Sequence, residues 1–139
     1  MVEDNPDDAD LTALAFRNNR IANRIVVARD GAEALDILFG TGTQADVPPG
    51  LPAVVILDVN LPKVPGIEVL QRIRSTPRTA LLPVVMHTTS VEDEDVLGSY
   101  RSGCNAYVQK PVSFDDFLDV TGKLGQFWLM LNVRPPAVT

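Results

Sequence analysis

The sequence predicts an α/β domain in which helices cover both faces of a parallel sheet. Short apolar runs rich in β-branched residues alternate along the chain with longer segments of helical periodicity. One such run, residues 54–57, contains no polar residue, as expected of a strand that is buried on both faces. The chain has 139 residues, which suits one domain with a substantial core.

Composition and charge narrow the possible functions. The formal net charge of −6 argues against nucleic acid backbones and anionic membranes as partners. The single Cys104 excludes an internal disulfide and fits a reducing compartment. With His87 as the one histidine, zinc clusters of the usual spacing are excluded. No apolar run approaches the roughly 18 residues of a membrane span, so we expect a cytoplasmic protein.

The first half of the chain opens with a helix. Asn5 followed by Pro6 is a good N-cap and first-turn pair. Asp7, Asp8 and Asp10 suit the positive end of the helix dipole, and we expect them to form a solvated first turn. The expected elements are a helix over residues 6–19, a strand over 25–28, a helix over about 32–40 and a surface loop over 41–52.

In the second half, a third helix is expected to follow the central strand. Ser90 and Asp93 form a segment that resembles a capping box and would open a weakly held fourth helix. Ser113 is expected to start the final helix. His87 and Cys104 are expected to be buried packing residues. The expected elements are helices over residues 66–75 and about 90–102, strands over 83–88 and 106–110, and a helix from 113.

Polar side chains follow the ends of the predicted strands: Glu3 and Asp4, Asp58, Thr88 and Lys110. The carboxyl ends of parallel strands share one sheet edge, where ligands bind. Phosphoryl transfer needs such a set, because its catalysis consists mostly of positioning and charge neutralisation. Asp58 is the predicted nucleophile, which would form an aspartyl phosphate. Lys110 and Thr88 would each bind a phosphoryl oxygen.

The same carboxylates suit a divalent metal. Carboxylates close together repel one another, and a hard cation with oxygen ligands relieves that repulsion. We predict Mg²⁺ or Mn²⁺, with Asp4, Asp58 and the backbone carbonyl of Asn60 as ligands and Glu3 acting mainly through water.

In these motifs the chain resembles the response-regulator receiver domain of two-component signalling, over roughly residues 1–124. The matching segments are VEDN at 2–5, LDVNLPKVPG at 57–66, PVVMHT at 83–88 and YVQKP at 107–111. The resemblance implies a flavodoxin-like, three-layer, doubly wound sheet of order 2-1-3-4-5 with five helices. It also implies a stand-alone signalling protein, phosphorylated by a sensor histidine kinase, that catalyses at most its own phosphorylation and dephosphorylation.

The resemblance further implies a switch and an output surface. Thr88 would move toward the phosphoryl group while Tyr107 turns inward, and a cis peptide would join Lys110 to Pro111. The fourth helix, the last strand and the fifth helix would form the output surface. The chain departs from the family at its start, because only Met1 and Val2 precede the acid pair. Either the start is truncated, or the first strand is short and the sheet is weakened beside the site.

Other functions remain open at this stage. The main alternative is a receiver-like interaction module that works without phosphorylation. Phosphatases that form an aspartyl-phosphate intermediate carry a D-x-D motif at the strand end. Here Asn60 stands at the position of the second Asp, which argues against this class. A flavin-binding relative would need a phosphate-cradling loop after the first strand, which this sequence lacks.

The last helix and the tail carry a second predicted feature. We divide the chain into a receiver domain, residues 1–124, and an extension of the last helix with the tail, residues 125–139. Phe127, Trp128 and Met130 are expected to form a homodimer contact, or to fold back over their own domain. Receivers paired with phytochrome histidine kinases are similar in carrying aromatic extensions. The helical spacing predicts that these side chains face the core: Phe114, Phe117, Leu118, Thr121, Leu124, Trp128 and Leu131.

Overall fold

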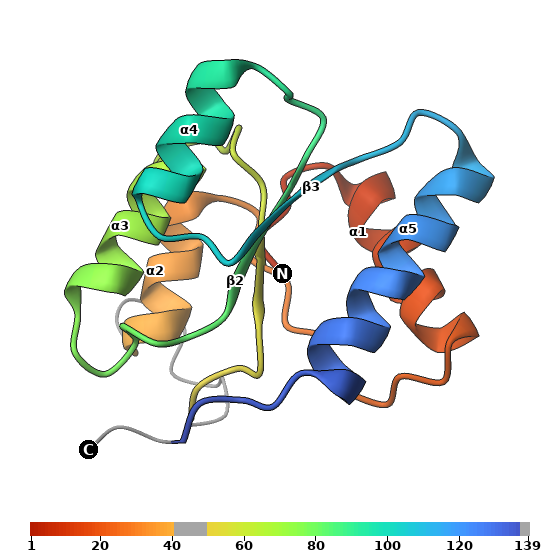
Figure 1. The fold of residues 1–139 in the computed structure, drawn as a ribbon, viewed down its shortest axis with the longest axis horizontal. Coiled ribbons are helices and arrows are strands. Elements are labelled where there is room, and N and C mark those ends of the chain that lie inside the picture. The colour runs from red at the N-terminus through yellow and green to blue at the C-terminus, as the bar shows by residue number, and fades with distance from the viewer. Residues whose placement is uncertain (41–49, 137–139) are drawn as a thin grey trace.

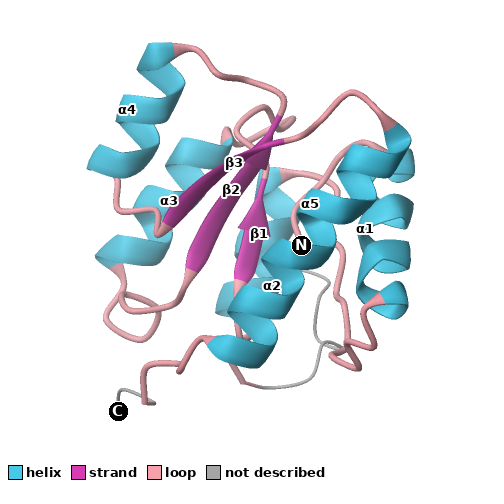
Figure 2. Ribbon diagram, turned by 45° about the vertical axis from the view of Figure 1, so that its right-hand side comes forward, coloured by secondary structure: helices cyan, strands magenta, loops and turns pink. Residues whose placement is uncertain are grey.

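The computed structural model describes residues 1–40 and 50–136 and shows a parallel sheet between two layers of helices. In this part of the chain three strands form a continuous ladder in the order β1-β2-β3, and every pairing is parallel (Figure 2). The strands are β1 Val55–Leu57, β2 Val84–Thr88 and β3 Ala106–Gln109. All residues of β1 and β2 are buried, as an apolar strand covered on both faces requires.

Two further segments extend the sheet beyond β1 through single bridges. Val2 pairs in parallel with both Leu57 and Ala28. Its N–H donates to the carbonyl of Ile56 at 2.7 Å, and the N–H of Ala28 donates to the carbonyl of Met1 at 2.9 Å. The spatial order is therefore Ala28, Val2, β1, β2 and β3, which confirms the predicted order 2-1-3-4-5. The strand expected over residues 25–28 is reduced to this bridge, because its neighbour offers little pairing backbone.

Five α-helices within the described residues cover the sheet. Figure 1 shows α1 and α5 on one face and α2, α3 and α4 on the other, so the predicted three-layer fold is confirmed. None of these helices combines the length and the apolar character that crossing a bilayer demands. The expected loop over residues 41–52 lies mostly outside the described residues. The helices are α1 Pro6–Asn18, α2 Gly31–Phe39, α3 Gly66–Ser75, α4 Asp93–Arg101 and α5 Phe114–Gln126.

The helix starts agree with the predicted caps except at α4. The side chain of Asn5 accepts from the N–H groups of Asp7 and Asp8, and that of Ser113 accepts from Asp116 N–H. The predicted capping box at Ser90 is wrong.

Helix α4 begins after Glu92, whose side chain makes no capping bond. The hydroxyl of Ser90 donates instead to the carboxylate of Asp95 at 2.6 Å. The Ser90 oxygen accepts from Glu92 N–H at 3.4 Å, and Glu92 precedes Asp93, the first residue of the helix.

Apolar side chains fill the space between the sheet and each helix layer. On the α2–α3 side, Leu57, Leu70 and Met86 are fully buried. On the α1–α5 side, Phe16 and Leu124 pack against the sheet. The buried positions predicted for His87, which is 2% exposed, and for Cys104 are confirmed.

The last helix changes geometry at its end. After α5 the chain continues as a π-helix, η1 Phe127–Leu131, closed by a bond from Asn132 N–H to the Phe127 carbonyl at 2.7 Å. A π-helix closes i→i+5 hydrogen bonds, and this wider winding rotates the side chains away from the positions that a 3.6-residue period predicts. Trp128 still packs against the α1–α5 cluster, whereas Leu131 is 72% exposed.

The predicted orientation of this helix is therefore only partly correct. Phe117, Thr121 and Leu124 are buried as expected. The prediction is wrong for Leu131, for the reason just given, and for Phe114, which is 56% exposed in the first turn of α5.

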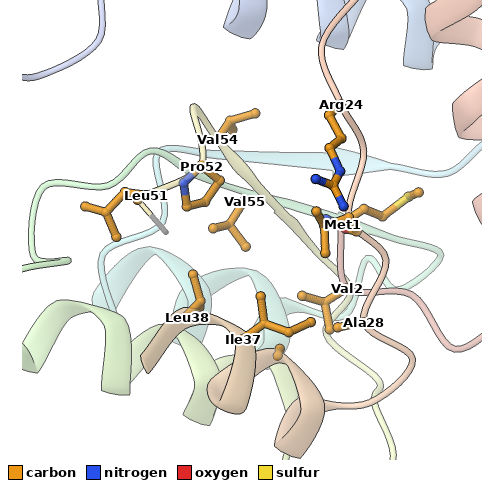
Figure 3. A pocket seen from close by; sticks show the side chains of 13 residues that line it. Met1, Val2, Arg24, Ala28, Ile37, Leu38, Leu51, Pro52, Val54 and Val55 are labelled. Atoms are coloured by element: carbon orange, nitrogen blue, oxygen red, sulfur yellow. Dashed lines mark hydrogen bonds between the residues drawn. The ribbon is translucent and has the colours of Figure 1, made fainter. Parts of the chain in front are cut away.

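An apolar cavity of about 280 Å³ lies beside the short first strand (Figure 3). Met1 and Val55 line it from the sheet, and Ile37 and Leu38 project into it from α2. The segment that ends at Val2, which the sequence predicts as a short first strand, pairs through single bridges beside this cavity.

Candidate functional site

The polar residues that follow the strands meet at one edge of the sheet. Asp58 directly follows β1, Thr88 ends β2 and Lys110 directly follows β3. The backbone fixes their relative positions, because Asp58 N–H donates to the carbonyl of Val2 at 3.2 Å and Lys110 N–H donates to that of Thr88 at 2.7 Å. Glu3, next to Val2, thereby lies beside Asp58.

Asp58 is buried, with 7% of its surface exposed, and both its carboxylate oxygens have partners. Oδ1 accepts from the N–H of Asn60 at 3.1 Å, and Oδ2 accepts from Nζ of Lys110 at 2.7 Å. Gly66, at the start of α3, lies close to the backbone of Asp58. A Cβ added at Gly66 would lie 2.0 Å from the carbonyl oxygen of Asp58. Only glycine permits this approach of α3 to the end of β1.

Lys110 is buried among three carboxylates. Its ammonium donates to Asp58, to Glu3 and, at 3.0 Å, to Asp8. Burial by itself would lower the pKa of Lys110, but the hydrogen bonds to Asp58 and Glu3 outweigh it and raise that pKa above its usual range. Lys110 therefore carries a fixed positive charge against the Asp58 carboxylate.

The carboxyl group of Glu3 has a raised pKa. Burial raises its pKa to about 7, and the hydrogen bond from Lys110 opposes this shift. The nearby charge of Asp58 raises the pKa further. A carboxyl group in this state gains from a cation that would hold it ionised.

Three of the predicted metal ligands lie together. One carboxylate oxygen each from Glu3, Asp4 and Asp58 fall within 4.8 Å of one another. Hard oxygen donors at this spacing fit Mg²⁺ or Mn²⁺. The ligand role of the Asn60 carbonyl stays a prediction.

The predicted switch residues, Thr88 and Tyr107, are hydrogen-bonded to the loop between β2 and α4. Thr88 is fully buried, and its hydroxyl oxygen accepts from Ser90 N–H at 3.3 Å. The hydroxyl of Tyr107 donates to the carbonyl of Ser90 at 2.9 Å. Both side chains thus contact the same loop residue. The cis peptide expected between Lys110 and Pro111 is wrong, since residues 1–40 and 50–136 contain none and the trans form is the more stable one for most X–Pro bonds.

The solvated position predicted for Asp8 is wrong, because its carboxylate accepts from Lys110. Asp8 lies one helical turn before Thr12 and two before Ala15, both of which are buried. This spacing places Asp8 on the inner face of α1. The periodicity of α1 was therefore the signal that could have found it.

The predicted interface residues lie on η1, at the opposite end of α5 from Ser113. Phe127 is 49% and Met130 61% exposed. Phe127 packs edge-on against Trp128, with ring centroids 5.0 Å apart. None of the three is brought to the site at Asp58.

Comparisons with known proteins agree with this geometry. The family model for the response regulator receiver domain matches residues 1–121. The response regulator Rcp1 of Synechocystis sp. (strain ATCC 27184 / PCC 6803 / Kazusa) is 33% identical over 137 residues, which cover 99% of this chain and 92% of Rcp1. The crystal structure of the Mn²⁺-bound form of Rcp1 superposes with a TM-score of 0.89, covering 96% of this chain and 95% of that one.

Two further solved structures concern phytochrome systems. The phosphorylated cyanobacterial phytochrome response regulator RcpA is 34% identical, with a TM-score of 0.90, covering 96% of this chain and 94% of its own. The bacteriophytochrome response regulator AtBRR is 50% identical, with a TM-score of 0.73, covering 95% of this chain and 94% of its own.

Proposed function

Because the chain belongs to the response regulator receiver domain family, we propose that it is a stand-alone response regulator that accepts a phosphoryl group on Asp58. The observation that carries this proposal is the buried Asp58 carboxylate, paired with Lys110 at 2.7 Å beside two further carboxylates. Such a site supplies a nucleophile, a fixed positive charge and oxygen ligands for a metal, which are the requirements of phosphoryl transfer.

The chemistry follows from these positions. A carboxylate oxygen of Asp58 attacks the phosphorus, the P–N bond to the kinase histidine breaks, and its electron pair stays on that nitrogen. Lys110 donates to a phosphoryl oxygen, and the Thr88 hydroxyl donates to another. A divalent cation held by Asp4, Asp58 and the Asn60 carbonyl, with Glu3 through water, would neutralise charge on the phosphoryl group. Members of the family are signalling proteins, and we assign this chain the catalysis of its own phosphorylation and dephosphorylation.

The output surface we propose consists of α4, β3 and α5. It carries exposed apolar side chains on Leu97, Tyr100 and Phe114. Tyr107 and Thr88 both contact Ser90, so a movement of Thr88 toward a phosphoryl group would change the loop that leads into α4. This arrangement supports a switch that is read by a partner protein in the cytoplasm.

Phosphoryl uptake from acetyl phosphate in Mg²⁺, followed by intact-protein mass spectrometry, tests the function. The wild type should gain one phosphoryl group and Asp58→Asn should gain none. Asp119→Asn is the matched control, because it removes an exposed carboxylate on α5 and should behave as wild type. No uptake by the wild type would overturn the proposal and favour an interaction module that works without phosphorylation.

A phytochrome histidine kinase is the kinase we propose. The support is the similarity to AtBRR and RcpA, whose names connect them with phytochromes. Phosphotransfer from a purified, autophosphorylated phytochrome kinase should be complete before transfer from a kinase of another sensor class becomes measurable. Equal rates from both kinases would contradict this assignment.

We also propose a homodimer that uses the extension formed by residues 125–139. Its support is the exposure of Phe127 and Met130 beside Trp128 on η1. Light scattering should give twice the mass of one chain for the wild type and one chain for Met130→Glu. Val112→Glu is the matched control, because Val112 is equally apolar and fully exposed away from η1. A wild-type mass of one chain, with and without a beryllofluoride mimic of the phosphoryl group, would refute the dimer.

A further inference from the structure

Asp8 is a carboxylate at the site to which the reaction described above assigns no role. Its Oδ2 accepts from Nζ of Lys110 at 3.0 Å, across 102 positions of sequence. The Asp8 side chain is 23% exposed, whereas that of Lys110 is 4% exposed. The buried ammonium of Lys110 is therefore hydrogen-bonded to a partly exposed carboxylate at the edge of the site.

The position of Asp8 is set by the packing of α1. Thr12, one turn later, is buried, and its hydroxyl donates to the carbonyl of Asp8 at 2.8 Å. Ala15 and Phe16, further along the same face, are buried, and Phe16 packs in the cluster between the sheet and α5. Helical spacing thus directs Asp8 toward the strand ends, while Asp7 beside it is exposed.

A lysine ammonium has three donors, and here each has its own carboxylate. Glu3 and Asp58 also belong to the trio of carboxylates that can hold a metal, and Asp58 is the proposed acceptor. Asp8 lies outside that trio. It is the partner that Lys110 can keep when Glu3 and Asp58 turn to other partners.

We propose that Asp8 is a positioning residue, which holds Lys110 at the site while Glu3 and Asp58 release it for the metal and the phosphoryl group. This inference rests on the proposed phosphoryl acceptance at Asp58. Without the Asp8 carboxylate, Lys110 would donate only to Glu3 and Asp58 and would compete more strongly for the oxygens that a divalent cation needs. The loss of one negative charge acts in the same direction, because it weakens attraction of the cation.

The chain offers closely matched variants. Asp8→Asn removes the carboxylate, Asp8→Glu keeps the charge, and Asp7→Asn changes the net charge and the first turn of α1 equally without touching Lys110. Lys63 and Lys123 are the other lysines, and both side chains are exposed. The ammonium of Lys110 should therefore give the one slowly exchanging lysine Nζ signal in nitrogen-15 spectra.

The first measurement uses the metal-free protein. Asp8→Asn should shift the Lys110 Nζ signal and speed the exchange of its protons with water, while Asp7→Asn should leave both unchanged. The second measures phosphoryl uptake from acetyl phosphate against Mg²⁺ concentration. The half-saturating concentration should rise about fivefold in Asp8→Asn and return toward the wild-type value in Asp8→Glu.

The outcomes separate this inference from the proposed function. A wild type that takes up no phosphoryl group refutes the function, and the inference falls with it. A phosphorylated wild type with Asp8→Asn equal to Asp7→Asn in both measurements refutes the role of Asp8 alone. Should Asp8→Asn fail to fold, as judged by circular dichroism, Asp8→Ser replaces it under the same expectations.

Discussion

Acidification should destabilise the protein through His87. This side chain is 2% exposed on β2, its Nε2 has no hydrogen-bond partner in the described part of the chain, and its ring lies against Phe117. Burial, and then the positive charge of Lys110, lowers the pKa of His87 from 6.5 to about 4, although the charges of Asp58 and Asp8 oppose the shift.

The sign and the magnitude follow from proton uptake. The unfolded chain protonates His87 near its ordinary pKa, and the folded chain does so only near 4, so stability is lost as the pH falls below about 6.5. At about 1.4 kcal/mol for each pH unit, acidification from about pH 7.5 to about pH 5 costs about 2 kcal/mol through this group.

The assay is urea unfolding of metal-free wild type and His87→Leu at these two pH values, followed by circular dichroism. All other titrating groups are common to both proteins. Between the higher and the lower pH, the unfolding free energy of the wild type should therefore fall by about 2 kcal/mol more than that of the variant. At the higher pH, His87→Leu should be at least as stable as the wild type, because it removes an unpaired buried nitrogen. Equal losses in the two proteins would show that His87 does not carry this pH dependence.

Two further predictions concern the site. Because the pKa of Glu3 is raised to about 7, its contribution to stability is lost as the pH rises through that value. Between about pH 4.5 and pH 8, the metal-free wild type should lose up to about 3 kcal/mol of unfolding free energy that Glu3→Gln keeps. Urea unfolding measures this difference. Identical pH profiles for the two would contradict this. Gly66→Ala forces a Cβ against the Asp58 carbonyl and should cost about 3 kcal/mol in thermal unfolding, whereas Gly98→Ala, which meets only the flexible tip of Ile67, should cost far less.

Much of the fold could be predicted because it depends on local patterns. The apolar run before Asp58 and the helical periodicity of the intervening segments identify a parallel sheet with helices on both faces. The N-caps at Asn5 and Ser113 are equally local, since a cap depends on residues three positions away at most. The prediction failed at Ser90, whose hydroxyl donates to the Asp95 carboxylate and accepts from Glu92 N–H, before the first helical residue.

Local patterns identify the residues that end the strands, and therefore predict that Asp58 and Lys110 share an edge of the sheet. What surrounds these two residues depends on tertiary packing. Glu3 reaches Lys110 across 107 positions of sequence because Val2 pairs with the end of β1. Asp8 reaches it across 102 positions because α1 packs its inner face against the sheet and α5. The close approach of α3 to the end of β1 at Gly66 is also a matter of packing. Such contacts depend on the relative placement of whole elements, which no short stretch of sequence encodes.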